Sequence, residues 1–173
     1  MQDGLSITSY FSNWFNTIWH GAFREVYEAK TDSRGVELWV IKKYRKDFSP
    51  VLKDVHLTIE EHAKKQVQMH SVAKYITDRF SKDAPEEFDK TFAHGDAFYA
   101  AYDGTHGTVE PYYAGDFLKY IKNDSAVPDN AISLDLNKKA GCLAHYSFEF
   151  TKRNIVLLDI QGTGYTLYDP EIL

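Results

Sequence analysis

Hydrophobic and polar positions alternate in two pairs of short stretches. Residues 22–30, AFREVYEAK, and residues 36–44, VELWVIKKY, alternate with period two, which is typical of half-buried strands. The segment TDSRG between them has the composition of a turn, so the pattern predicts an antiparallel hairpin. AFYAAY (97–102) and GTVEPYY (107–113) flank DGTHG and predict a second hairpin.

Two longer stretches have helical periodicity. The first runs from about Lys53 to Phe80 without a proline and ends at SKDAPEE, and the second is predicted from about Ala131 to Phe150, with Gly141 inside it. After Asn154 the apolar run IVLLD predicts a short strand that is buried on both faces. Because hairpins come early and a helix followed by a strand comes late, the order predicts an α+β fold rather than a doubly wound sheet.

Length and composition allow one domain of 173 residues, or two small lobes with a boundary near residues 110–116, EPYYAGD. A net charge of −5 does not favour a nucleic-acid partner. There is no apolar run long enough for a membrane span, and the N-terminus is too polar for a signal peptide, so we expect a cytoplasmic protein. The single cysteine, Cys142, cannot form an internal disulfide. The oligomeric state is not indicated.

Lys42 shares one face of its predicted strand with Leu38 and Val40. The lysine either points inward, where it needs an anionic partner such as a phosphate, or lies on the surface with its charged end in water. Gly21 precedes the first strand and Arg24 lies just inside it. A glycine there permits close approach of a ligand to the backbone, but the pattern by itself favours an ordinary turn glycine beside a surface arginine.

The last fifteen residues, DIQGTGYTLYDPEIL, contain a group of oxygen-bearing side chains. Asp159 ends the predicted strand, Gln161 follows it, and Gly162 and Gly164 permit a sharp turn before Asp169. Two carboxylates and an amide oxygen form a set of ligands that Mg²⁺ prefers, and phosphoryl transfer needs a residue that orients the accepting hydroxyl. An acidic turn without a functional role explains the same composition.

Five segments, in order, resemble the alpha-kinases, an atypical protein kinase family. They are GAFREVYEAK, WVIKKY, KKQVQMHSVAKYITDRF, VEPYYAGDFLKYIKND and AHYSFEFTKRNIVLLDIQGTGYTLYDPEI, which cover nearly the whole chain. The resemblance implies a two-lobed catalytic domain with an ATP cleft between an N-terminal lobe, residues 1–110, and a C-terminal lobe, residues 111–173. It also implies transfer of a phosphate from ATP to a serine or threonine of a protein substrate, with Mg²⁺.

On the nucleotide side, the resemblance places Lys42 on the ATP phosphates. Gly21 and Arg24 correspond to positions near the nucleotide. Glu110 corresponds to a hinge glutamate that holds the adenine.

On the catalytic side, Asp159 resembles the catalytic aspartate of the family, and Lys119 in FLKY resembles a catalytic-loop lysine. Gln161 and Asp169 resemble magnesium ligands. Tyr168 stands where the family usually has threonine. Glu171 stands where the family commonly has glutamine.

The family continues beyond the last matched segment with a glycine-rich loop and a structural zinc site of two histidines and two cysteines. His145 resembles the first zinc ligand and the other ligands have no counterpart, so the resemblance predicts an incomplete C-terminal lobe. The other six histidines show no motif and are interpreted as ordinary polar positions. The alternative to a kinase is a catalytically inactive module, a pseudokinase or fragment, that binds a nucleotide or a partner.

Overall fold

The computed structural model describes residues 11–20, 23–31, 37–45, 48, 52, 54, 56–102, 104–124, 126 and 134–173. The chain forms two compact units, which are described separately below. The first unit holds residues 1–68 and 97–112, and the second holds residues 69–96 and 113–173. Among the described residues, no helix is both long enough and apolar enough to cross a membrane.

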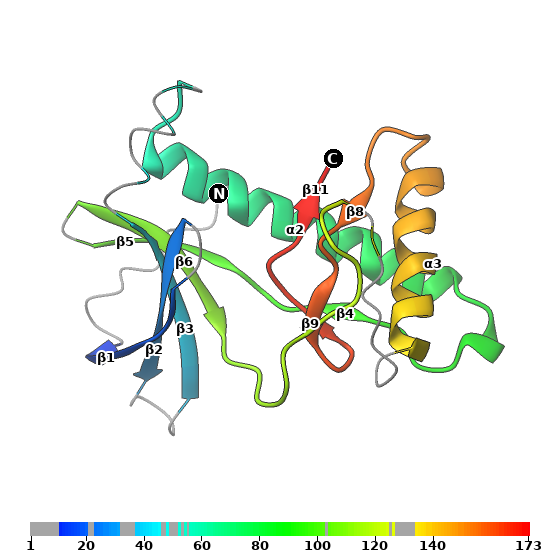
Figure 1. The fold of residues 1–173 in the computed structure, drawn as a ribbon, viewed down its shortest axis with the longest axis horizontal. Helices are drawn as coiled ribbons and strands as arrows, with labels where there is room; N and C mark the ends of the chain where they lie inside the picture. Colours follow the sequence, from blue (N-terminus) through cyan, green and yellow to red (C-terminus); the bar gives the residue numbers. More distant parts are fainter. Residues whose placement is uncertain are drawn as a thin grey trace. The chain divides into compact units, whose positions relative to one another are not determined.

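The described elements combine strands with two long helices, as the predicted α+β class requires (Figure 1). In chain order they are β1 (Phe11–His20), β2 (Arg24–Thr31), β3 (Glu37–Tyr44), α2 (Ile59–Asp83), a 3-10 turn (Glu86–Phe88), β4 (Ala93–His94), β5 (Phe98–Tyr102), β6 (Thr105–Pro111), β7 (Leu118–Lys119), α3 (Leu134–Phe150), β8 (Leu157–Leu158), β9 (Gln161–Thr163), β10 (Thr166–Leu167) and β11 (Glu171–Ile172).

The first unit is built on a five-stranded sheet in the order β1-β2-β3-β6-β5. Both predicted hairpins are confirmed, because β2 pairs antiparallel with β3 and β5 pairs antiparallel with β6. The two hairpins meet where β3 pairs antiparallel with β6, which places Lys42 opposite Thr108 and Val40 opposite Glu110. The small core on this sheet contains Ile41 and Val109.

The long helix α2 starts later than the periodicity predicts, at Ile59 rather than Lys53. Thr58 and Glu61 explain this start because they form a capping box: the Thr58 hydroxyl accepts the Glu61 N–H at 3.1 Å, and the Glu61 carboxylate accepts the Thr58 N–H at 2.9 Å. These bonds satisfy N–H groups that the first helical turn leaves without partners. The capping pair was present in the sequence and fixes the boundary more sharply than hydrophobic spacing does.

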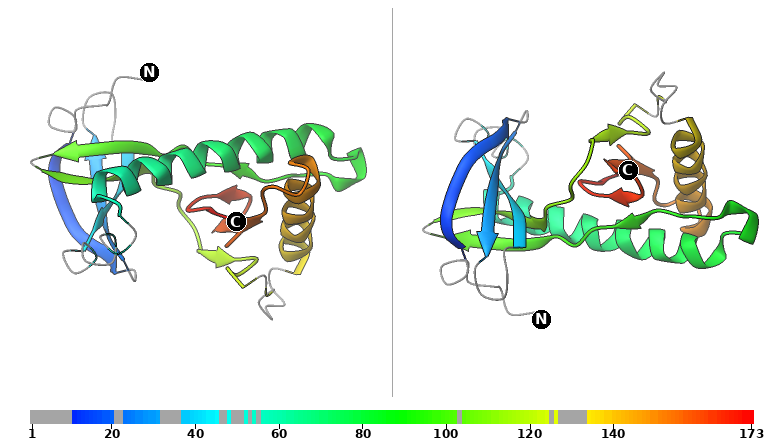
Figure 2. Two further views of the ribbon diagram at one scale, coloured as in Figure 1. Left: turned by 90° about the horizontal axis from the view of Figure 1, so that it is seen from above. Right: turned by 90° about the horizontal axis from the view of Figure 1, so that it is seen from below.

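The second unit contains the larger core. Its buried residues come from α2, the segment before β4, the segment after β7, α3, and the last strands with the turn between β8 and β9; they are Ala73, Ile76, Phe80, Phe92, Tyr120, Ile121, Ala140, Leu143, Leu157, Leu158, Ile160 and Leu167. A four-stranded sheet has the order β4-β10-β9-β7, and β8 pairs with β11. Both views of Figure 2 show α3 beside these C-terminal strands.

The division into units differs from the expected boundary in one respect. A break does fall between Tyr112 and Tyr113, within the predicted 110–116 segment, but residues 69–96 belong to the second unit. The reason is that the later turns of α2 contribute Ala73, Ile76 and Phe80 to the second core. A boundary read along the sequence cannot reveal a helix that contributes to two cores.

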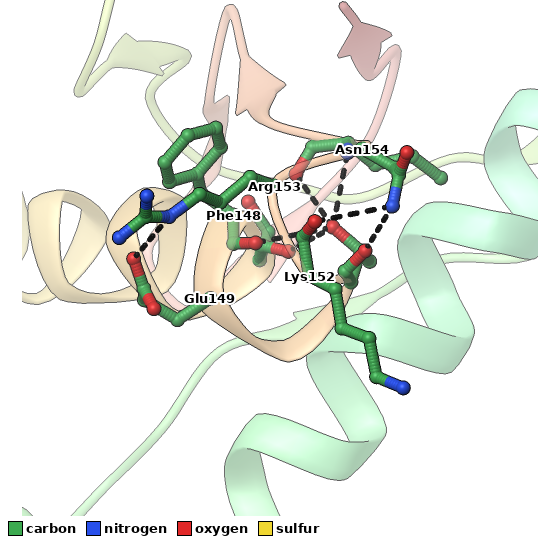
Figure 3. A network of polar contacts seen from close by, with 8 residues as sticks. Phe148, Glu149, Lys152, Arg153 and Asn154 are labelled. Carbon is green, nitrogen blue, oxygen red and sulfur yellow. Dashed lines mark hydrogen bonds and ion pairs between the residues drawn. The ribbon is translucent and has the colours of Figure 1, made fainter.

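The end of α3 is a hydrogen-bonded cap (Figure 3). The Phe148 carbonyl accepts the Arg153 N–H at 2.7 Å, while Lys152 and Arg153 adopt left-handed φ values of 55° and 65°. The side-chain amide of Asn154 donates to the carbonyls of Thr151 and Lys152. These bonds end the helix and reverse the chain toward β8.

Ser147 and Thr151 connect this cap to the strand that follows it. The Ser147 hydroxyl accepts the Leu157 N–H at 2.9 Å, and the Thr151 hydroxyl accepts the Ile155 N–H, also at 2.9 Å. The predicted strand at IVLLD is present but shorter, since only Leu157 and Leu158 form β8. Both are buried, whereas the two residues before them are half-buried.

Candidate functional site

Lys42 and Glu110 form a buried ion pair in the first unit. The Lys42 ammonium donates to the Glu110 carboxylate at 2.9 Å, and the side chains are only 9% and 4% exposed. Thr108 also donates to Glu110, at 3.4 Å. The surface interpretation of Lys42 is therefore wrong: the lysine is buried, and its anionic partner in this structure is a protein carboxylate. Its assignment to ATP phosphates stays a prediction.

Gly107 explains how closely β6 approaches the Lys42 backbone. A Cβ on residue 107 would lie 2.3 Å from the Lys42 carbonyl oxygen, so a larger residue would push the strands apart. Arg24 is half-buried at the start of β2, opposite Tyr44. Burial and the charge of Arg24 hold the pKa of His62 below its ordinary value. Gly21 lies outside the described residues, so its expected role stays a prediction.

Lys119 and Asp159 lie together in the second unit. The Lys119 ammonium donates to the Asp159 carboxylate at 2.6 Å, and these side chains are 37% and 18% exposed. Lys119 is held by β7, which pairs with β9, and Asp159 directly follows β8. The structure thus brings together the two residues that the resemblance placed in the catalytic set, although they are forty positions apart in sequence.

Gln161 and Asp169 form a second contact in the same unit. The Gln161 side-chain amide donates to the Asp169 backbone carbonyl at 3.1 Å, and the Tyr168 N–H donates to the Gln161 backbone carbonyl at 3.2 Å. These bonds tie the two ends of the β9–β10 hairpin to each other. The two residues predicted to bind magnesium, Gln161 and Asp169, are therefore held in one small frame, which consists of the β9–β10 hairpin and the turn after it.

Asp159 and Asp169 share an unusual backbone conformation, with φ values of 49° and 55°. Left-handed backbone is uncommon outside glycine, although aspartate tolerates it better than most residues. Such conformations occur often at functional sites, where the surrounding structure enforces them. Here the first follows β8 directly and the second lies between β10 and β11, so pairing of these strands fixes both turns.

Tyr120 braces the loop between Gln161 and Asp169. Its ring is fully buried, and its hydroxyl donates to the Gly164 carbonyl at 2.7 Å. Burial, with the neighbouring tyrosines, raises the pKa of Tyr120 to about 12, so the hydroxyl keeps its proton near neutral pH. The sequence did not identify this brace because nothing in FLKYIKND distinguishes it from a core aromatic residue.

Two histidines that the sequence analysis treated as ordinary polar positions are buried in the second unit. His70 is 3% exposed and His94 is 8% exposed. Burial, followed by the positive charges of His70 and Lys74, lowers the pKa of His94 to about 3. A signal for His70 existed, because it lies three residues before Ala73 and ten before Phe80, on the apolar stripe of α2.

The residues present do not fit a structural zinc site. His145 is exposed on α3, and the exposed Cys142 lies one turn before it on the same helix. Within the described part of the chain, His145 belongs to no cluster of three or more potential metal ligands. A structural zinc site needs four ligands in a closed arrangement, and this surface does not supply them.

Solved structures identify the fold. The apoenzyme alpha-kinase domain of myosin-II heavy chain kinase A matches with a TM-score of 0.71 and 18% sequence identity, over 92% of this chain and 73% of that one. The same domain in complex with AMP-PNP matches with a TM-score of 0.72 and 17% identity, over 92% and 72%. The architecture is therefore an alpha-kinase fold, of which this chain forms a part.

The chain belongs to the alpha-kinase family, whose sequence model matches residues 19–173. Transient receptor potential cation channel subfamily M member 7 of Rattus norvegicus is 26% identical over 151 residues, which make up 81% of this chain and 8% of that protein. Eukaryotic elongation factor 2 kinase of Homo sapiens is 33% identical over 64 residues, which are 37% of this chain and 8% of that kinase. The chain thus spans a small part of these relatives, and its family membership supports a kinase.

Proposed function

We propose that this chain is the catalytic part of a protein serine/threonine kinase that transfers the γ-phosphate of ATP to a protein hydroxyl. The observation that carries the proposal is the Lys119–Asp159 pair, a partly exposed carboxylate held at 2.6 Å by an ammonium group. Asp159 directly follows a buried strand and has a left-handed backbone conformation. The strand therefore holds the backbone from which the carboxylate extends. Family membership supports the reaction class.

Asp159 has the chemistry to receive and orient the hydroxyl of the substrate. An ionised carboxylate accepts a hydrogen bond from the attacking O–H, and it takes up the proton as the new phosphate ester forms. Lys119 binds one carboxylate oxygen, Oδ1, which leaves Oδ2 for the substrate. Because the pair is 37% and 18% exposed, a peptide can reach it without prior unfolding.

Gln161 and Asp169 fit Mg²⁺ by the chemistry of their donors. The amide group of Gln161 uses its nitrogen for the Asp169 carbonyl, so its oxygen remains as the donor for a cation beside the Asp169 carboxylate. Oxygen donors of this kind are the ligands that Mg²⁺ takes in phosphoryl-transfer enzymes. When bound, the ion supplies neutralisation of the phosphate charge.

Lys42 is the proposed phosphate-binding residue of the first unit. Its burial removes competing water and makes its charge more effective than that of a surface lysine. Glu110 fixes the position of the ammonium at 2.9 Å, and an ammonium with three N–H donors has the chemistry to contact a phosphate oxygen as well as a carboxylate. ATP binding is further supported by solved structures of myosin heavy chain kinase A with ADP and with AMP-PNP.

The test is phosphate transfer from γ-labelled Mg-ATP to a threonine-containing peptide. Asp159→Asn keeps the size of the side chain and removes its charge, so we expect transfer to fall by about 10²–10⁴-fold. Asp78→Asn is the matched control, because Asp78 is an exposed carboxylate on α2 in the same unit. Equal transfer by wild type and Asp159→Asn would rule out the catalytic assignment.

A second candidate is a nucleotide-binding module that performs no transfer. The specific observation in its favour is that Glu110 already satisfies Lys42 inside the first unit, so the buried lysine has a structural role without any phosphate. Thermal unfolding with and without Mg-ATP separates the two candidates. A rise in Tm without phosphate incorporation would favour the module, and incorporation that depends on Asp159 would favour the kinase.

A further inference from the structure

Strand register in the second unit separates a buried face of the β4-β10-β9-β7 sheet from a face that carries proposed site residues. On the buried face, Gly162 pairs with Leu118 on one side and with Leu167 on the other, and both leucines pack into the core of the unit. On the opposite face, Lys119 lies opposite Gln161. This second face, called the Lys119 face below, therefore holds one member of the proposed catalytic pair.

Alternation along the strands places two aromatic side chains on the same face. Phe117 directly precedes β7 and lies two positions before Lys119, so it shares that side of the sheet. On the β9–β10 hairpin, Thr163 pairs with Thr166, and Tyr168 follows two positions later. The contacts agree with this placement, because the Tyr168 and Thr163 hydroxyl oxygens are 3.1 Å apart and the Phe117 ring lies 6.1 Å from the Tyr168 ring.

Three aromatic rings form a cluster beside the Lys119 face. Tyr113 and Tyr168 stack with their ring centroids 5.9 Å apart and their planes at 11°, while the Phe117 ring is inclined at 35° to that of Tyr168. Gly95 lies against this group, since a Cβ there would be 2.5 Å from the Tyr113 hydroxyl oxygen. Tyr113, Phe117 and Tyr168 are called the aromatic cluster below, and all of them belong to the second unit.

The three rings differ in exposure, and this difference gives them different tasks. Phe117 is 57% exposed, whereas Tyr113 and Tyr168 are half-buried. An exposed phenyl ring offers apolar area, and its burial against another apolar side chain is favourable. Tyr168 contacts Phe117 and is itself held by the Tyr113 ring and by the Thr163 hydroxyl. Phe117 is therefore the ring that a ligand can contact, and Tyr168 is the ring that positions it.

We propose that Phe117 determines substrate specificity by binding an apolar side chain of the protein substrate close to the accepting hydroxyl, and that Tyr168 positions Phe117. The proposal rests on the proposed function, because it names the class of substrate for the same site. Residues two apart in an extended chain are about 6.6 Å apart, a spacing that Phe117 and Lys119 share with an extended peptide. When a threonine of such a peptide reaches the Asp159 carboxylate, a flanking side chain therefore lies near Phe117.

The chemistry of the cluster favours an apolar side chain over a cationic one. Phenylalanine is a weaker partner for a cation than tryptophan is, and an exposed ring contributes least to such a contact. The neighbouring Asp116 carboxylate would attract a cation, but it is exposed, so water and salt screen its charge. An arginine beside the acceptor is the competing occupant, and the test includes it.

The test compares threonine peptides that differ only in the residues flanking the threonine, which are leucine, alanine or arginine. With Mg-ATP, the wild-type chain should use the leucine peptide with a kcat/KM about tenfold above that for the alanine peptide. Phe117→Ala should bring this ratio close to one. Phe148→Ala is the matched control, since it removes an exposed phenylalanine of α3 from the same unit, and it should leave the ratio unchanged. A wild-type preference for arginine, or an unchanged ratio in Phe117→Ala, would overturn the proposal.

Two variants test the positioning role of Tyr168. Tyr168→Phe keeps the ring, so the ratio of leucine to alanine peptide should stay close to that of the wild type. Tyr168→Leu removes the ring, and the ratio should fall by about threefold or more. A variant that only lowers the amount of folded chain slows both peptides equally and leaves the ratio unchanged. Equal ratios in the wild type and in Tyr168→Leu would overturn the role of Tyr168.

Peptide binding without nucleotide separates this proposal from the proposed function. Fluorescence anisotropy of the labelled leucine and alanine peptides measures their affinities for the full chain whether or not phosphate is transferred. A leucine preference that depends on Phe117, in a chain that transfers no phosphate, would support the binding role and count against the kinase proposal alone. Equal affinities for the two peptides, with transfer that depends on Asp159, would overturn the role of Phe117 and leave the kinase proposal standing.

Discussion

Two lysine–carboxylate pairs, one in each unit, differ in exposure more than in geometry. Lys42 and Glu110 are 9% and 4% exposed, with their charged atoms 2.9 Å apart. Lys119 and Asp159 are 37% and 18% exposed, with their charged atoms 2.6 Å apart. The contacts are similar, so the environment must account for any difference in what the pairs do.

The difference separates a pair that is required for folding from a pair that is available for chemistry. Removing one partner of a buried pair leaves an unpaired charge away from water, which is costly. A partly exposed pair exchanges its partner for water at little cost, so its carboxylate can bind a substrate. All four residues were candidates in the sequence, but only the structure shows how they pair and which charges are desolvated.

The largest expected effect is on the buried pair. Lys42→Met leaves Glu110 buried without its cation, and we expect the free energy of unfolding to fall by about 3–5 kcal/mol. Urea denaturation followed by circular dichroism measures the change. The double variant Lys42→Met/Glu110→Leu should recover most of the loss, because no buried charge remains. If the single and double variants are equally destabilised, the cost comes from packing rather than from the unpaired charge.

A buried histidine extends the comparison to the second unit. The pKa of His94 is lowered from 6.5 to about 3, so below pH 6.5 the unfolded chain binds a proton that the folded chain does not. Stability should therefore fall as the pH drops from 6.5 toward 3, by up to about 1.4 kcal/mol per pH unit. Urea denaturation between pH 6.5 and 4.5 measures the slope, and His94→Gln should flatten it. An unchanged slope in the variant would show that other groups control the acid sensitivity.

Breaking the partly exposed Lys119–Asp159 pair should affect phosphate transfer more than stability, the reverse of what we expect for the buried pair. Lys119→Met should change the free energy of unfolding by no more than about 1 kcal/mol, because Asp159 regains water. Phosphate transfer should nevertheless fall by about tenfold or more, since the carboxylate loses the group that positions it. Parallel urea denaturation and transfer assays measure both quantities. A loss of stability as large as that of Lys42→Met would remove the distinction between the pairs.

The smallest effect concerns two glycines in the second unit. Gly141 lies inside α3, and a Cβ there would meet no atom within 4 Å, so Gly141→Ala should stabilise the chain by about 0.5–1 kcal/mol. Gly162→Ala should destabilise it, because the new Cβ would lie 2.0 Å from the Thr166 carbonyl oxygen in the frame that carries Gln161 and Asp169. Thermal unfolding of the two variants compares them, and a gain in Tm for Gly162→Ala would contradict the described register.

Local patterns in the sequence predicted the local structure well. Alternation identified β2 with β3 and β5 with β6, and the run of helical spacing identified α2 and α3. The boundaries were less accurate where hydrogen bonds, rather than burial, set them. Thr58 starts α2 through its cap, and the Ser147 and Thr151 hydroxyls accept the backbone N–H groups of Leu157 and Ile155, where the strand after α3 was expected to begin.

The candidate site was predictable residue by residue but not as a set of contacts. Lys119 and Asp159 were each singled out, yet only the pairing of β7 with β9 and the turn after β8 bring them together. The resemblance assigned Glu110 to adenine, and the structure instead shows its carboxylate bound to Lys42, while the adenine role stays a prediction. The burial of His70 was missed, although its spacing from Ala73 and Phe80 places it on the apolar stripe of α2.

The central claim is that Asp159 serves the transfer step and not nucleotide binding. The most direct measurement follows ATP affinity and phosphate transfer in the same preparations of wild type and Asp159→Asn. We predict that both bind Mg-ATP with affinities within about threefold of each other and that only the wild type transfers phosphate at a measurable rate. Transfer by Asp159→Asn at the wild-type rate, with ATP bound equally well, would contradict the account.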